Sequence, residues 1–195
     1  GVDVVLIGDS LGMVIQGDKN TRSVTMQDML YHTEIVANSC QQALVVADMP
    51  FLSYQPSVEE TIKNAGVLIK KGGASAVKLE GGVRVADNIK ALVDHGIPVL
   101  GHVGLTPQSY NQLSGYKIQG KTMASALKIY QDALALEKIG VFAASIVNEI
   151  RESAIKLESR NIFLSQRLMQ LAQKVRPQGS LINAKLAEYE KKIKG

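Results

Sequence analysis

The sequence contains very little cysteine and no long apolar run. Cys40 is the single cysteine among 195 residues, so the chain cannot form an internal disulfide and offers no cysteine cluster for zinc. Such a composition is typical of a reducing compartment, and we expect a cytoplasmic protein. No stretch approaches the roughly 18 continuous apolar residues of a membrane helix, and no signal peptide is visible. We therefore expect no membrane partner.

The larger part of the chain also lacks an excess of charge of either sign. Residues 148–195 carry ten Lys/Arg and five Asp/Glu, whereas residues 1–147 carry twelve and thirteen. The net charge of +4 therefore comes from the C-terminal quarter, where it is more typical of a solvated helix face than of a nucleic-acid site. We expect no nucleic-acid partner.

Short β-branched runs alternate with helical patterns through residues 1–147. This alternation predicts βα units on a parallel sheet, and therefore the α/β class. Glycines end several of the helical patterns just before the next strand, where a left-handed residue is usual. The chain opens directly into the first strand, so we expect sequence to precede it. The expected strands are 4–7, 43–47, 76–79, 99–101 and 142–147, and the expected helices are 26–38, 57–71, 85–95 and 122–139.

Polar, chemically capable side chains follow four consecutive expected strands, namely Asp9, Asp48, Glu80 and His102. In parallel barrels the active site forms where the carboxyl ends of the strands meet the βα loops. Carboxylates are the ligands that Mg²⁺ prefers, so three acidic strand ends predict a shared metal site. The alternative is that each aspartate caps the following helix. GDSLG at residues 8–12 matches no glycine-rich phosphate-binding fingerprint.

Lys78 lies two residues before Glu80, so both side chains project from one face of the expected strand, toward the barrel interior. Burying two charges costs several kcal/mol unless they are paired or used. The pair is therefore either a structural ion pair or an anion-binding lysine beside a metal-linked carboxylate. We expect His102 to support the site from behind the metal ligands.

The pattern changes after residue 147. Apolar residues there alternate in spacings of four and three, which predicts one long helix with a heptad seam, broken at residues 176–179 and followed by a second, shorter stripe. The segment 148–195 is therefore expected to be a coiled-coil-like helical hairpin. The seam consists of Ile150, Ala154, Leu157, Asn161, Leu164, Leu168, Leu171 and Val175, and the second stripe of Ile182, Leu186, Tyr189 and Ile193.

Several motifs in residues 1–143 together resemble one known family. They are GDSLGM (8–13), VADMPF (46–51), VKLEGG (77–82), GHVGLTPQ (101–108) and NQLSGYK (111–117). In this order they closely resemble ketopantoate hydroxymethyltransferase, also called 3-methyl-2-oxobutanoate hydroxymethyltransferase, an enzyme of pantothenate biosynthesis. The resemblance implies a (β/α)₈ TIM-type barrel, a homo-oligomer, bound Mg²⁺, and two substrates, 3-methyl-2-oxobutanoate and 5,10-methylenetetrahydrofolate.

The resemblance also implies roles for particular residues. Asp9 and Asp48 would ligate the metal directly, and Glu80 would complete the site directly or through water. Ser10 and Lys78, together with Asp9 and Asp48, would contact the substrate.

The sequence departs from the family pattern in two respects. The position of the proton-abstracting glutamate is occupied by Val147, and Glu149, two residues further on, is a weak substitute. About five βα units are present, so residues 1–147 are expected to form an incomplete barrel domain followed by the helical tail 148–195. The resulting hypotheses are an impaired hydroxymethyltransferase, a related enzyme for another 2-oxo acid, or a non-catalytic remnant whose tail mediates coiled-coil assembly.

Overall fold

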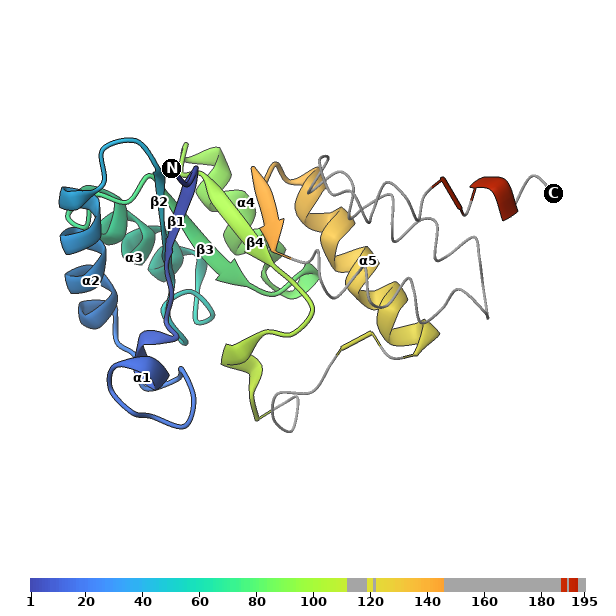
Figure 1. Ribbon diagram of the computed structural model, residues 1–195, viewed down its shortest axis with the longest axis horizontal. Helices are drawn as coiled ribbons and strands as arrows, with labels where there is room; N and C mark the ends of the chain where they lie inside the picture. The colour runs from blue at the N-terminus through green and yellow to red at the C-terminus, as the bar shows by residue number, and fades with distance from the viewer. Residues whose placement is uncertain (112–118, 121, 146–186, 189, 193–195) are drawn as a thin grey trace.

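The computed structural model describes residues 1–111, 119–120, 122–145, 187–188 and 190–192 (Figure 1). Its centre is a parallel sheet of five strands, whose order in space is their order in the chain. Figure 1 shows them side by side, from β1 in blue to β5 in orange. The α/β prediction is confirmed. The strands are β1 (Val4–Ile7), β2 (Leu44–Asp48), β3 (Ala76–Glu80), β4 (Val99–His102) and β5 (Ala143–Ser145).

A helix follows each of the first four strands and covers the sheet. Consecutive helices among α2, α3, α4 and α5 contact one another, so they form a layer beside the strands. The bounds are α1 (Leu11–Val14), α2 (Met26–Ser39), α3 (Val58–Lys70), α4 (Ala86–Asp94) and α5 (Met123–Lys138), with 3₁₀ turns η1 (Val83–Val85) and η2 (Pro107–Ser109). The short elements α1, η1 and η2 were not predicted, because a single turn has no apolar periodicity.

Hydroxyl side chains, and not the strand-end aspartates, cap the long helices. The Thr25 side chain accepts a hydrogen bond from the backbone N–H of Asp28 at the start of α2. The Ser57 side chain accepts one from the backbone N–H of Glu60 at the start of α3. Thr122 caps α5. The alternative that Asp9 and Asp48 serve as helix caps is therefore wrong, because other residues satisfy the first N–H groups of these helices.

The core lies between the helix layer and the sheet, and β2 and β3 are its most buried strands. In β2, Val46 and Ala47 are fully buried, and in β3 so are Val77 and Leu79. Strands buried on both faces are expected of a parallel sheet, which explains their continuous apolar runs. The helices contribute large side chains to the same core, including Met29, Leu68, Ile89, Leu92 and Leu136.

The predictions for the C-terminal quarter fall mostly outside the described residues. The heptad seam, the hairpin break, Val147 and Glu149 all lie in undescribed segments, and the domain boundary at 147/148 stays a prediction. Residues 187–188 and 190–192 are helical, and Lys192 pairs with Glu188 at 2.8 Å. Within the described ranges, no helix is both long and apolar enough to cross a membrane.

Candidate functional site

The predicted site residues gather at the carboxyl edge of the sheet. Asp48 ends β2 and lies in register with Lys78 on β3, while Glu80 ends β3 in register with His102 on β4. Asp9 follows β1 across one glycine. The side chains of Asp9, Asp48, Lys78 and Glu80 are all buried, and His102 is half-buried. Parallel strands therefore bring together groups that are far apart in the sequence.

Asp48 lies at the centre of a buried charge cluster. One carboxylate oxygen, Oδ1, accepts a hydrogen bond from the Lys78 ammonium at 2.5 Å. The other, Oδ2, accepts one from the backbone N–H of Asp9 at 3.0 Å. Of the two alternatives for Lys78 and Glu80, the structural ion pair between them is not what forms, because adjacent parallel strands place Asp48 directly beside Lys78.

Burial shifts the ionisation of two of these groups. Burial, followed by the charge of Asp48, raises the pKa of the Asp9 carboxyl to about 6. Burial alone would lower the pKa of Lys78, but the attraction of Asp48, helped by Glu80 and Asp9, raises it above its ordinary value. Lys78 therefore stays a cation near neutral pH, and Asp9 lacks enough positive charge around it.

Glu80 has separate partners. Its Oε2 accepts a hydrogen bond from the backbone of Gln108 at 2.9 Å. Its Oε1 faces Nδ1 of His102 at 3.4 Å, and among the described residues neither atom has a hydrogen-bond partner. Across the described residues, no three His, Cys, Asp or Glu side chains are grouped as ligands of one metal ion. The close carboxylate pair is therefore Asp9 and Asp48, with Glu80 beside His102.

Ser10 is exposed and opens α1 as its N-cap residue. A side chain at Gly8 would meet the Ser10 hydroxyl at 3.0 Å and Oδ2 of Asp48 at 3.5 Å. Glycine at position 8 therefore leaves room for the serine hydroxyl to lie close to the Asp48 carboxylate. Of the predicted contacts to substrate, Ser10 is the one whose side chain is accessible.

Two uncharged residues, Gln108 and Tyr54, belong to the same network and were missed from the sequence. The Gln108 amide donates a hydrogen bond to Oδ2 of Asp9 at 2.9 Å. The Tyr54 hydroxyl lies 2.8 Å from the Gln108 carbonyl oxygen and accepts a hydrogen bond from the backbone of Glu80. The pattern of charged strand ends does not include them, because neither residue ends a strand and neither carries a formal charge. The signal for Gln108 was its place in the motif GHVGLTPQ.

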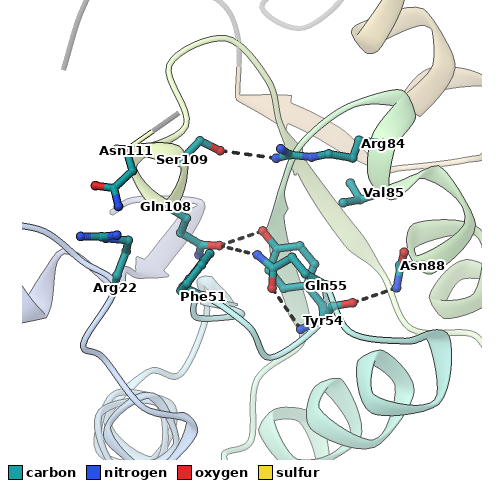
Figure 2. Close-up of a pocket in the computed structure, with 10 residues that line it drawn as sticks. All are labelled: Arg22, Phe51, Tyr54, Gln55, Arg84, Val85, Asn88, Gln108, Ser109 and Asn111. Atoms are coloured by element: carbon teal, nitrogen blue, oxygen red, sulfur yellow. Dashed lines mark hydrogen bonds between the residues drawn. The ribbon is translucent and has the colours of Figure 1, made fainter. Parts of the chain in front are cut away.

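A cavity of about 390 Å³ lies next to the buried cluster (Figure 2). Tyr54 and Gln108 form part of its lining, and Arg22 and Arg84 belong to the same lining. Figure 2 shows Arg84 extending toward Ser109, which it meets at 3.4 Å. None of the predicted site residues Asp9, Asp48 or Lys78 lines the cavity, so Gln108 separates the cavity from Asp9.

Comparison with known proteins gives a consistent result. The sequence profile of the family described as ketopantoate hydroxymethyltransferase matches residues 1–162. The chain is 60% identical over 143 residues to a 3-methyl-2-oxobutanoate hydroxymethyltransferase of Dehalococcoides mccartyi, which covers 73% of this chain and 51% of that protein. A protein of the same name from Clostridium beijerinckii is 56% identical over 143 residues, 73% of this chain and 52% of its own length. The chain spans about half the length of the curated relatives it matches.

A parallel sheet with acidic groups converging at its carboxyl edge is typical of the α/β enzymes that act at this edge. Within that class, the chain belongs to the ketopantoate hydroxymethyltransferase family. The prediction made from its motifs is confirmed.

Proposed function

We propose that this chain takes part in hydroxymethyl transfer from 5,10-methylenetetrahydrofolate to 3-methyl-2-oxobutanoate, giving ketopantoate for pantothenate biosynthesis. The observation that carries the proposal is the buried arrangement of Asp9, Asp48 and Lys78 at the carboxyl edge of the sheet. The names of relatives that are 55–60% identical support the choice of reaction. We also propose that the chain is cytoplasmic, forms a homo-oligomer and binds the two small-molecule substrates. Residues 1–147 would form an incomplete barrel.

The donor set fits a divalent cation. Asp9 and Asp48 supply hard oxygen ligands, and Mg²⁺ is usually held by one or two carboxylates with water and substrate oxygens in its remaining positions. The raised pKa of Asp9, about 6, marks a carboxylate whose negative charge is poorly compensated, which a cation would correct. Glu80 would complete the site directly or through water. When bound, the metal would act as a Lewis acid on the carbonyl of the 2-oxo acid.

Lys78 and Ser10 suit the binding of an anionic substrate. Lys78 keeps its charge while buried, so its ammonium can attract the carboxylate of a 2-oxo acid in a site with little competing water. The Ser10 hydroxyl lies at the exposed side of the same corner and can donate a hydrogen bond to an oxygen of that substrate. His102 would help to orient the Glu80 carboxylate, which its Nδ1 faces.

The reaction also requires a base that removes the C3 proton of the 2-oxo acid. The residue at the corresponding place is Val147, with Glu149 two positions further on. General base catalysis is worth about 10²–10⁴-fold. We therefore propose that turnover by this chain is impaired, whereas binding of the metal and the 2-oxo acid is retained.

The test separates binding from turnover. Isothermal titration of the full chain with Mg²⁺ and then 3-methyl-2-oxobutanoate should show binding of the acid that depends on the metal. Asp48→Asn should abolish it, whereas Asp94→Asn, an exposed aspartate paired with Lys90, should leave it unchanged. Metal-independent binding, or equal binding by Asp48→Asn, would contradict the proposal. Other branched 2-oxo acids in the same titration define the substrate, and an assay of Val147→Glu measures the missing base.

A further inference from the structure

Gln108 connects four segments of the chain at one point. Its side-chain amide donates to the Asp9 carboxylate and to the backbone carbonyl of Met49, each at 2.9 Å. Its own backbone N–H donates to Oε2 of Glu80 at 2.9 Å. Gln108 itself lies in η2, after β4, and is 4% exposed. One buried residue thereby binds groups that lie at the end of β3 or just after β1 and β2.

The orientation of the amide is determined by its neighbours. The carbonyl oxygen of Gln108 faces two donors, the Tyr54 hydroxyl at 2.8 Å and the Gln55 amide at 3.3 Å. A reversed amide would bring that oxygen against the Met49 carbonyl and the Asp9 carboxylate. A carbonyl oxygen can only accept hydrogen bonds, and the same is true of the Asp9 carboxylate when it is ionised. The two donors and two acceptor sites of the amide are all used, so rotation would break four hydrogen bonds.

Tyr54 fixes the amide from the other side. Its ring is fully buried, and its hydroxyl accepts a hydrogen bond from the backbone of Glu80 at 3.1 Å. The one hydroxyl proton can serve one acceptor at a time, and Gln108 at 2.8 Å is closer than the Glu80 carbonyl at 3.0 Å. Tyr54 therefore ties the Gln108 amide to the backbone of Glu80. Gln108 itself links the two carboxylates, because its side-chain amide binds that of Asp9 and its backbone N–H binds that of Glu80.

We infer that Gln108 is a positioning residue, whose amide and backbone N–H hold the carboxylates of Asp9 and Glu80 in the geometry that ligand binding requires. The inference rests on the proposed function, because it assigns Gln108 to the same metal and 2-oxo acid site. Groups that orient metal ligands from behind typically change metal affinity about 10–100-fold when they are removed.

Metal affinity gives the first test. In the full chain, Gln108→Met keeps the size of the side chain but loses its hydrogen bonds, and should weaken Mg²⁺ binding by titration calorimetry about 10–100-fold. Gln108→Glu, the second variant in case the first fails to fold, keeps an acceptor for Tyr54 but loses the amide donors. Asn64→Leu is the matched control, because it removes a half-buried amide that bonds the Ser53 carbonyl; it should bind Mg²⁺ like the parent. Unchanged affinity in both Gln108 variants would overturn the inference.

A second readout does not depend on the metal. In ¹⁵N NMR spectra of the full chain, the side-chain N–H protons of Gln108 should exchange with water slowly, since both are hydrogen-bonded and buried. The resonance should disappear in Gln108→Met and persist in Asn64→Leu. If the parent chain binds no Mg²⁺, the proposed function fails and the positioning role fails with it, whereas slow exchange would still show that the Gln108 amide is held in place. Rapid exchange at Gln108 would overturn it whatever the metal does.

Discussion

The charged residues of this protein differ greatly in how far their side chains are buried. Lys78 and Asp48 form a pair whose side chains are both almost completely buried, whereas Lys90 and Asp94 form a pair on the exposed surface of α4. A buried charge that loses its partner is left without solvent or counterion, while an exposed one is hydrated. The same substitution should therefore destabilise the fold much more at Lys78 than at Lys90.

Lys78→Met should lower the free energy of unfolding by about 3–5 kcal/mol, because it leaves the Asp48 carboxylate buried without its cation. Lys90→Met is the matched control and should change it by less than about 1 kcal/mol. Urea unfolding at pH 7 measures both. A loss at Lys78 no larger than that at Lys90 would show that water or another group compensates Asp48.

Asp9 should make the stability depend on pH. Its pKa in the folded chain is about 6, against an ordinary 3.8, so between these values the folded state binds more protons than the unfolded state. Stability from this group is complete below pH 3.8 and is lost as the pH rises through 6, by as much as about 3 kcal/mol. Unfolding by urea from pH 3.5 to 7.5 should show this loss in the parent and not in Asp9→Asn. Asp3→Asn, at an exposed position, should retain it; equal slopes in all three would contradict the prediction.

At the scale of secondary-structure elements, α5 packs closely against the turn that follows β3. The backbone N–H of Val83 donates to the Asp132 carboxylate at 3.0 Å. A Cβ atom at Gly82 would lie 2.1 Å from Cβ of Asp132, which no side chain can occupy without moving the helix. Glycine at position 82 is therefore required because α5 packs so closely against it, and not because of a role in the reaction.

Gly82→Ala should destabilise the fold by about 1–3 kcal/mol, because the added methyl overpacks the contact between η1 and α5. Gly66→Ala provides the opposite control. Gly66 lies inside α3 with open space where its Cβ would be, so alanine should stabilise by about 0.5–1 kcal/mol through its helix propensity. Thermal unfolding of the two variants compares them directly. Equal changes in stability for the two variants would mean that α5 can shift to accommodate the added methyl group.

On the scale of the whole molecule, β1 forms an apolar edge. In the described part of the chain β1 pairs with β2 alone, and Val4 and Leu6 are nearly half exposed. Val14 and Ile15, in and just after α1, are more exposed still. Unpaired strand edges with apolar side chains are a common route to association between chains.

We therefore expect residues 1–195, expressed by themselves, to self-associate through β1, and Leu6→Lys to reduce the association. A charged side chain on an edge strand must be desolvated before a second chain can pair with it. Light scattering after size-exclusion chromatography at several concentrations measures the mass. Leu127→Lys, which changes a similarly exposed leucine on α5, should leave the mass as in the parent. A mass that falls equally in both variants would locate the contact elsewhere.

The order of elements was predictable because it depends on local patterns. β-branched runs, threonine and serine caps, and glycines such as Gly96 and Gly140, which have positive φ, act within a few residues of themselves. The family was predictable for a related reason, since its motifs at Asp9, Asp48 and Lys78 are continuous stretches of sequence.

The pairing inside the site was decided by the tertiary structure alone. Spacing within one strand suggested Lys78 with Glu80, but the register between strands placed Asp48 beside Lys78 and His102 beside Glu80. The role of Gln108 became visible only when a loop after β4 reached Asp9, 99 residues away. The sequence by itself determined which groups are present and which strand each one follows. Hydrogen bonding between strands and loops determined which groups meet, because those contacts depend on distances in space that no local pattern encodes.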